Sequence, residues 1–227
     1  MRFRIDLKIF LFLIVFYFTK QLEIYILMII FAIIHELAHL VAGILLGFKP
    51  DKLELIPVGL TVSFRVNLDD FMSKLHNGNK LILKEIIVAL AGPLINILIT
   101  IIAFFINIDY TEKLLIIYLN LLIAIFNLLP IYPLDGGRIL KGILHIFLGR
   151  KKAQSFIYDI SIVTNIVLTA IASIAILYLK NISIFIIILY LWCIVLRESI
   201  IYNKKMKLYE EVKNKLEGER LNDYSSK

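Results

Sequence analysis

The chain has 227 residues, of which 60% are hydrophobic and 19% are charged, and its formal net charge is +7. Soluble domains are roughly 45–50% apolar, so this composition excludes an ordinary soluble protein and indicates an integral membrane protein. In such a chain the excess of basic residues usually reports topology. We therefore expect a lipid bilayer, and no nucleic acid, as its surroundings.

Runs of about 17–25 apolar residues predict membrane-spanning helices. The first apolar segment, residues 5–19, is short and follows basic residues as a signal peptide would, but no small-residue cleavage site comes after it, so we expect a retained helix. Longer spans are predicted at residues 24–48, 86–106, 113–132, 156–179 and 182–200. The predicted fold class is an all-α polytopic membrane protein with about six transmembrane helices.

The longest connection, residues 49–85, contains the stretch KLELIPVGLTVSFRV at residues 52–66. Its β-branched residues and partial alternation predict a small β-hairpin at the membrane surface, between the second and third helices. The segment after the last span is strongly charged. We therefore expect a transmembrane domain over residues 1–202 and a charged cytosolic tail over residues 203–227.

Basic residues gather on one side of the predicted membrane. All Lys and Arg residues except Lys20, Lys113 and Lys180 lie in segments that six spans place on the same side. Because cytoplasmic segments carry the excess of Lys and Arg, both termini and the functional side of the protein are expected to face the cytosol.

The second predicted helix contains the sequence HELAH, in which His35 and His39 are one helical turn apart. Residues at i and i+4 share a helix face, so both imidazoles can reach one metal ion and Glu36 can reach its bound water. A charge at mid-membrane costs at least ~2.5–3.5 kcal/mol on insertion scales, so a charged Glu36 at this depth implies a compensating interaction or a function. Two alternatives involve no metal: hydrogen bonds within the helix bundle, or a proton relay in a transporter.

A catalytic zinc ion usually has three protein ligands and an open position for water. His76 and His145 lie in predicted connections and are expected to be surface or interfacial histidines. The stretch FNLLPIYPLDGGRIL at residues 126–140 is a better source, because prolines and glycines free backbone groups that must face protein or water. Asp135 in this stretch is the predicted third ligand, and its alternative role is to cap the following helix.

Two asparagines stand in apolar surroundings. The third predicted span, residues 86–106, contains the sequence ALAGPLINILI, whose Gly92 allows close helix packing and whose Asn96 needs a hydrogen-bond partner. Asn127 follows at the end of the next span. We expect Asn96 or Asn127 to orient the substrate backbone or to stabilise an oxyanion.

The sequences HELAH, AGPLIN and NLLPIYPLDGG occur in this order within residues 24–140 and together resemble the site-2 intramembrane metalloprotease family. The compact layout resembles the branch of the stage IV sporulation protein FB. The resemblance implies an intramembrane endopeptidase with one Zn²⁺ per chain, held by His35, His39 and Asp135, with Glu36 as the catalytic base. It implies a membrane-associated protein precursor as substrate, which in sporulating bacteria is that of a late sigma factor, cut in the membrane around the forespore.

Many members of that branch have a C-terminal CBS domain, whereas only residues 201–227 follow the last predicted span. Regulation by ATP through such a domain is therefore not expected, although the family resemblance admits an inhibitory membrane partner. Two other classes remain as alternatives. A proton-coupled transporter should show internal repeats, and a non-catalytic membrane anchor should tolerate the loss of Glu36.

Overall fold

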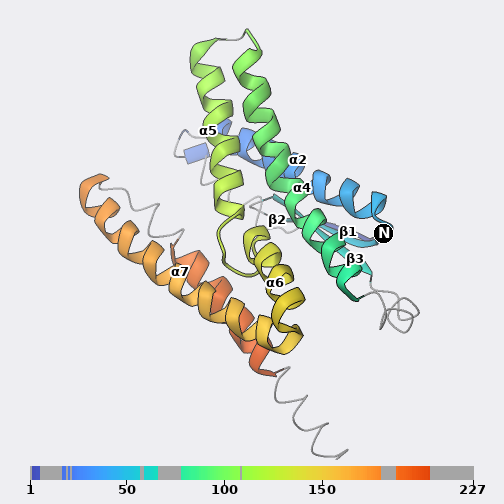
Figure 1. Ribbon diagram of the computed structural model, residues 1–227. Coiled ribbons are helices and arrows are strands. Elements are labelled where there is room, and N and C mark those ends of the chain that lie inside the picture. The colour runs from blue at the N-terminus through green and yellow to red at the C-terminus, as the bar shows by residue number, and fades with distance from the viewer. Residues whose placement is uncertain are drawn as a thin grey trace, which may run out of the picture. The chain divides into compact units, whose positions relative to one another are not determined.

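A computed structural model of the chain describes residues 2–5, 17–18, 20, 22–56, 59–65, 78–107, 109–179 and 188–204. Its elements are β1 (Arg2–Ile5), α2 (Leu22–Leu45), β2 (Lys49–Ile56), β3 (Gly59–Arg65), α4 (Gly78–Phe105), α5 (Tyr110–Asn127), α6 (Asp135–Leu148) and α7 (Arg150–Leu179) (Figure 1). A further helix covers residues 188–204. The chain forms two compact units, Met1–Pro130 with Leu134–Ile157, and Ile131–Pro133 with Tyr158–Lys227.

Long apolar helices dominate the described residues. Four of them are long and apolar enough to cross a membrane: Leu22–Leu45, Asn79–Phe105, Tyr110–Asn127 and Lys152–Ile174. Large apolar side chains stand on their outer faces, and Leu45 and Phe105 are 81% and 86% exposed. Apolar faces of this kind have a lower free energy in contact with lipid than in contact with water. The predicted total of six spans is not tested by the described residues and stays a prediction.

Three predicted helix boundaries differ from the structure by five residues or more. The helix α7 begins at Arg150 rather than at residue 156, and α4 begins at Gly78 rather than at residue 86. The first turns of both helices contain charged residues, and hydropathy marks the membrane-crossing part of a helix rather than its start. The helix α5 ends at Asn127 rather than at residue 132. Pro130 has no backbone N–H and disfavours a helical conformation in the residue before it, so the helix stops short.

A three-stranded sheet precedes α4 in the chain, with the strand order β1, β2, β3. The strands β2 and β3 are antiparallel, with Lys49 opposite Arg65, and they cover most of the segment 52–66 in which strands were expected. The strand β1 pairs with β2 in parallel, with Arg2 opposite Lys52. The location of this sheet at a membrane surface stays a prediction.

The strand β1 corrects the expected start of the first helix. Ile5 lies in β1 rather than in a helix over residues 5–19. Pairing with a strand that is distant in sequence decides this conformation, and local hydropathy carries no information about such a partner. Residues 6–16, which make up most of the predicted helix, lie outside the described residues, as do residues 205–227 of the predicted tail.

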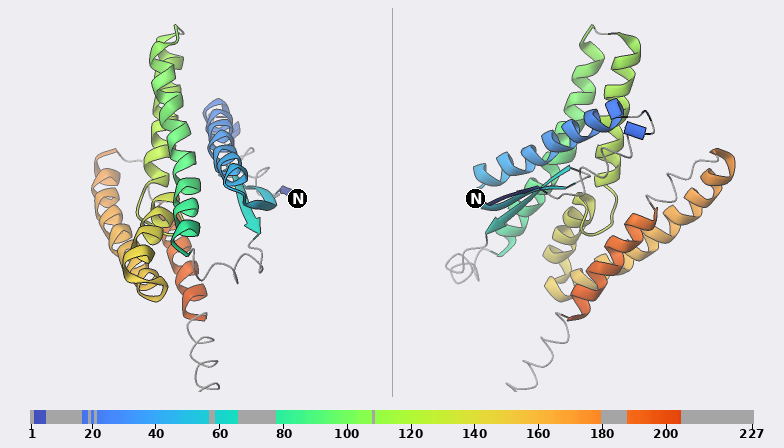
Figure 2. Two further views of the ribbon diagram at one scale, coloured as in Figure 1. Left: turned by 45° about the vertical axis from the view of Figure 1, so that its right-hand side comes forward. Right: turned by 180° about the vertical axis from the view of Figure 1, so that it is seen from behind.

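The helix α4 is the centre of the larger unit. It packs against α2, α5 and α6, and the sheet packs against α2 through β3 (Figure 2). The ammonium group of Lys84 on α4 donates a hydrogen bond of 2.8 Å to the carbonyl oxygen of Leu46, just beyond the end of α2. A β-carbon at Gly142 of α6 would lie 2.6 Å from Cγ1 of Ile86 on α4, so these helices are in close contact. This packing brings the start of α6 to the middle of α2.

Two side-chain hydrogen bonds link helices within the smaller unit. The indole of Trp192 donates to the hydroxyl of Thr169 at 3.0 Å, and the hydroxyl of Ser199 donates to that of Tyr158 at 2.9 Å. These bonds join α7 to the helix over residues 188–204.

Candidate metal centre

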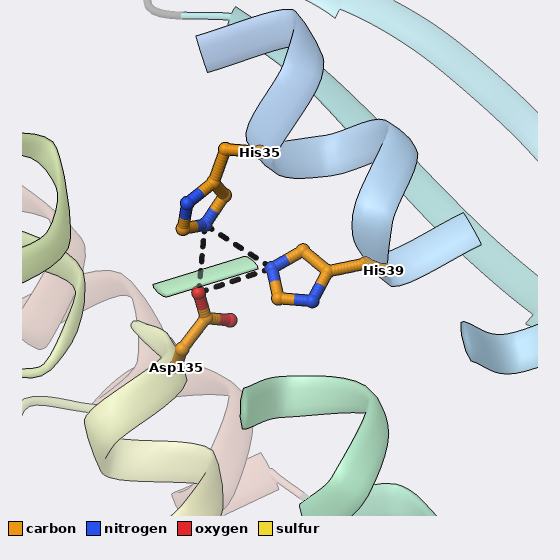
Figure 3. Close-up of side chains that lie close together, drawn as sticks. All are labelled: His35, His39 and Asp135. Atoms are coloured by element: carbon orange, nitrogen blue, oxygen red, sulfur yellow. Dashed lines mark hydrogen bonds and ion pairs between the residues drawn. The ribbon is translucent and has the colours of Figure 1, made fainter. Parts of the chain in front are cut away.

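Three side chains converge in the larger unit from two helices (Figure 3). His35 and His39 lie on α2, and their Nε2 atoms are 3.2 Å apart. The Oδ2 atom of Asp135, the first residue of α6, is 3.0 Å from Nε2 of His35 and 3.1 Å from Nε2 of His39. The three residues are 2%, 3% and 5% exposed. Within the described residues they form a group that could hold a metal ion.

Asp135 does not cap the helix that it begins. Leu134 occupies the N-cap position of α6 and makes no side-chain capping bond. The carboxylate of Asp135 points toward the two imidazoles instead, so the capping alternative is wrong. A negative charge in the first turn is favoured by the helix dipole, which helps to hold the carboxylate in its ionised form at this place.

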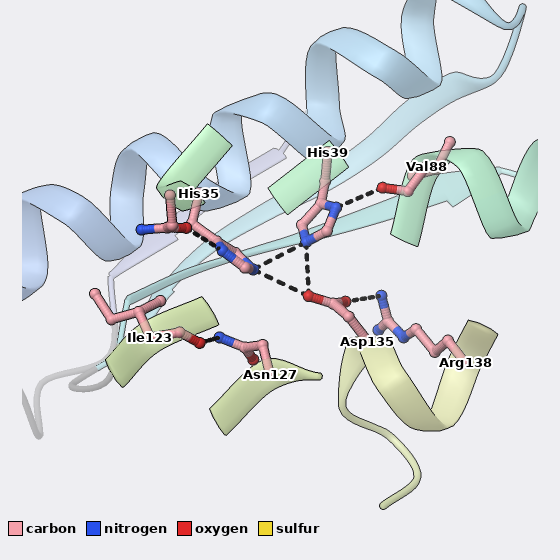
Figure 4. Close-up of polar contacts among 8 residues, drawn as sticks. His35, His39, Val88, Ile123, Asn127, Asp135 and Arg138 are labelled. Carbon is pink, nitrogen blue, oxygen red and sulfur yellow. Dashed lines mark hydrogen bonds and ion pairs between the residues drawn. The ribbon is translucent and has the colours of Figure 1, made fainter. Parts of the chain in front are cut away.

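The outer nitrogen of each imidazole faces a hydrogen-bond acceptor (Figure 4). The Nδ1 atom of His39 is 2.6 Å from the backbone carbonyl oxygen of Val88, and Nδ1 of His35 is 2.6 Å from Oδ1 of Asn96. Because a carbonyl oxygen can only accept, each Nδ1 carries a hydrogen, and the Nε2 atom of each neutral ring presents a lone pair to the centre.

Two nitrogen lone pairs and a carboxylate oxygen therefore face one another. Such an arrangement is unfavourable unless a proton or a cation lies among the three atoms. Ligands bound at about 2.0–2.1 Å to a tetrahedral zinc ion lie about 3.3–3.4 Å from one another, and the separations in this site are 3.0, 3.1 and 3.2 Å. The donor set, its tautomers and its spacing thus fit a divalent metal with one further position for water.

Gly92 on α4 lies directly beside the two imidazoles. A β-carbon at this position would be 2.5 Å from Nε2 of His35 and would also collide with the ring of His39. Only glycine lets the backbone of α4 approach the ligand atoms so closely. The sequence predicted close helix packing at this residue, and the structure shows that the metal-type centre is what the glycine accommodates.

Two charged residues border the centre. Glu36 is half-buried on α2 and interacts electrostatically with both histidines, with Asp135 and with Arg138. A guanidinium nitrogen of Arg138 is 3.9 Å from Oδ1 of Asp135, and the side chain is 52% exposed. Arg138 was not among the predicted site residues, although its position three residues after Asp135 on the same helix was a usable signal.

The two predicted asparagines differ in their surroundings. Asn96 is fully buried, and its amide bonds to His35 on one side and to Asn120 on the other. Asn127 is half-buried and donates a 3.0 Å hydrogen bond to the carbonyl oxygen of Ile123 (Figure 4). Asn120 was not among the predicted site residues, although it is an amide within an apolar span like Asn96.

The two other histidines are not part of the cluster that the structure describes. His145 lies in the last turn of α6, and His76 falls outside the described residues. The predicted set of His35, His39 and Asp135 is thus the set that the fold brings together, and its role as a ligand set is taken up below as a proposal.

The fold and the site define an integral membrane protein with a buried metal-type centre. Residues 23–112 and 111–171 match peptidase family M50. The chain belongs to this family, the family of the site-2 proteases.

Two curated relatives and one solved structure are similar to this chain. The zinc metalloprotease MJ0392 of Methanocaldococcus jannaschii is 33% identical over 127 compared residues, and the match covers 53% of this chain and 34% of the relative. The stage IV sporulation protein FB of Bacillus subtilis is 30% identical over 127 compared residues, and the match covers 54% of this chain and 40% of the relative. The matched stretch thus spans well under half the length of either relative.

The solved structure is a site-2 protease from Methanocaldococcus jannaschii. Its chain superimposes with a TM-score of 0.61 at 24% sequence identity, over 86% of this chain and 89% of the other. This likeness shows a shared fold.

Proposed function

We propose that the protein is a zinc-dependent intramembrane endopeptidase that cuts a membrane-associated protein precursor. The observation that carries the proposal is the convergence of three acceptor atoms, Nε2 of His35, Nε2 of His39 and Oδ2 of Asp135, at separations of 3.0 to 3.2 Å. One Zn²⁺ per chain would be held by these three residues. The match to family M50 supports a peptidase.

Each residue of the centre has a part in the proposed reaction. When bound, the zinc ion supplies Lewis-acid polarisation of the scissile carbonyl and activates water for attack. The carboxylate of Glu36 accepts the proton of the attacking water and later gives it to the leaving amine. The imidazoles of His35 and His39 keep the orientation that their outer hydrogen bonds impose, and Asp135 contributes the negative charge that offsets the cation.

A helical substrate has every backbone carbonyl already hydrogen-bonded, so part of it must unwind before it can be cut. The strands β1 and β3 are the edges of the three-stranded sheet, and β3 packs on the helix α2 that carries the histidines. We propose that an extended segment of substrate pairs with an edge of this sheet. Asn127, near the centre at the end of α5, is proposed to bind the substrate backbone.

The distribution of Lys and Arg supports a topology of six spans in which both termini and the active site face the cytosol. In that topology the sheet lies at the cytosolic membrane surface, residues 1–202 form the protease domain and residues 203–227 a cytosolic tail. Similarity to the stage IV sporulation protein FB supports a sporulation sigma-factor precursor as the first candidate substrate.

The test combines elemental analysis of purified protein with a cleavage assay in cells that co-express a candidate precursor. Wild type and Glu36→Gln should each contain about one zinc per chain, whereas His39→Ala and Asp135→Ala should contain little. Only the wild type should cut co-expressed candidate precursors. Cleavage by Glu36→Gln would contradict the role of the base, and a wild type without zinc would favour the proton relay of a transporter instead.

A further inference from the structure

A line of side-chain amides leads away from His35 through α4 to α5. The Nδ1 atom of His35 is 2.6 Å from Oδ1 of Asn96. The amide nitrogen of Asn96 donates a 2.9 Å bond to Oδ1 of Asn120, whose own nitrogen donates a 2.9 Å bond to the backbone carbonyl oxygen of Ile116. Both asparagines are 0% exposed, and both lie in helices long enough to span a membrane.

The backbone carbonyl of Ile116, at the end of this line, determines the direction of each hydrogen bond in it. The carbonyl oxygen of Ile116 can only accept, so the NH₂ group of Asn120 must face it and the oxygen of Asn120 must face Asn96. The NH₂ group of Asn96 then faces Asn120, and its oxygen faces His35. This oxygen holds the ring hydrogen of His35 on Nδ1 and leaves the lone pair of Nε2 for the centre.

Without Asn120, nothing in this line fixes the rotation of the Asn96 amide. If the amide turns over, its NH₂ group faces Nδ1 of His35, and the ring hydrogen moves to Nε2. A protonated Nε2 atom cannot bind a metal. The tautomer of His39 does not depend on a side-chain amide, because its Nδ1 atom bonds to the backbone carbonyl of Val88, whose orientation the helix fixes.

Packing alone gives no reason for two buried amides in apolar helices. An amide transferred out of water costs free energy unless it is hydrogen-bonded, and interhelical hydrogen bonds of this kind in membranes contribute only about 0.6 kcal/mol on average. A leucine at position 120 would fill the contact between α4 and α5 without that cost. The amide is explained by what its orientation does to Asn96.

We propose that Asn120 is a positioning residue of the metal centre, which through Asn96 sets the tautomer of His35 that presents Nε2 to the metal. The inference rests on the proposed zinc site. It gives Asn96 a role in holding a ligand, whereas the sequence alone suggested contact with substrate.

The test measures zinc affinity by competition with a chelator, together with the visible spectrum of the Co²⁺-substituted protein, which reports ligand number and geometry. Asn120→Leu should bind zinc more weakly, by up to the roughly 10–100-fold loss that removal of a direct partner of a metal ligand causes, with an altered cobalt spectrum. Asn120→Ala, which adds no bulk, should weaken zinc binding in the same way and replaces the leucine variant if that protein does not fold.

The rescue variant separates positioning from packing. Asn96→Asp places a carboxylate beside His35 that accepts from Nδ1 in either rotation. The double variant with Asn120→Leu should therefore recover zinc affinity to within about threefold of the wild type and its cobalt spectrum. The matched control is Thr100→Val, because Thr100 donates a buried 2.9 Å bond to the backbone oxygen of Asn96 outside the line of amides. This control should leave zinc affinity unchanged.

Zinc binding of Asn120→Leu equal to that of the wild type would overturn the inference, and so would a loss that Asn96→Asp does not rescue. Both results leave the zinc site itself in place. A wild type that binds no zinc would overturn the proposed function and this inference together, so the two failures are distinguishable.

Discussion

Replacement of Gly92 by alanine tests the metal centre without touching any proposed ligand. The new β-carbon would lie 2.5 Å from Nε2 of His35. An ordinary contact between such atoms is about 3.5 Å, so the ring or the helix must shift by about 1 Å. Metal–ligand distances are held to about ±0.2 Å, and a 1 Å shift is several times that margin. We therefore expect zinc affinity to fall at least about 100-fold, or about 2.8 kcal/mol.

The same substitution should not damage the helix in which it stands. Alanine is a better helix former than glycine by about 0.5–1 kcal/mol, which partly offsets the roughly 1–3 kcal/mol cost of overpacking, so zinc-free Gly92→Ala should stay folded with a stability at most about 2.5 kcal/mol below that of the zinc-free wild type. The imidazole cannot simply turn aside, because Asn96 holds its outer nitrogen at 2.6 Å. Loss of metal with retention of the fold is the specific signature that we expect.

The assay is zinc content per chain after dialysis against a buffered zinc concentration, combined with thermal unfolding in detergent. Gly43→Ala is the matched control, since its β-carbon would collide with the ring of Phe64 on β3 and with no proposed ligand. That variant should bind zinc within about threefold of the wild type. A Gly92→Ala protein that also binds zinc with wild-type affinity would refute the argument that this glycine accommodates the ligand atoms.

Three other outcomes follow from the same geometry. Arg138→Met should weaken zinc binding by no more than about fivefold, because a 3.9 Å ion pair with Asp135 from a half-exposed side chain is worth about 0–1 kcal/mol; a loss of zinc comparable to that in Asp135→Ala would contradict this estimate. Gly43→Ala should keep its zinc but lose about 1–3 kcal/mol of stability in chemical unfolding, because the added methyl group collides with the ring of Phe64 on β3 and overpacks the contact between sheet and helix. Zinc at 1,000 times its dissociation constant should stabilise the wild type by about 4 kcal/mol and Asp135→Ala hardly at all, and equal stabilisation of both in thermal unfolding would show that zinc binds elsewhere.

The sequence was sufficient to find the three side chains that the fold brings together, because each of them lies in a local pattern with a physical meaning. The i and i+4 spacing of His35 and His39 puts both rings on one helix face, and the break around Pro130 places Asp135 at the start of a new helix. These patterns operate within a few residues, so they can be recognised before the fold is known. The match of the chain to family M50 is in agreement with them.

What surrounds the ligands could not be predicted in the same way. Val88, Asn96 and Asn120 are partners of the centre only because α4 packs between α2 and α5, and no pattern within one helix states which neighbour an amide will meet. The strand β1 was missed for the same reason, since its partner β2 is about 50 residues away. Such long-range partners are determined by tertiary packing, which local sequence patterns do not describe.

The two histidines of the proposed metal site are held by different kinds of hydrogen-bond partner. The outer nitrogen of His39 bonds to the backbone of α4 at Val88, so this ring stays in place for as long as the helix does. The outer nitrogen of His35 depends on two side chains in succession, and either of them can be changed without altering a backbone bond between the helices. Substitutions on α5 should therefore reach the metal through His35 and not through His39. The cobalt spectrum of Asn120→Leu can be compared with that of a variant that lacks the His39 side chain. If the two spectra match, α5 affects the centre by a route other than Asn96 and His35.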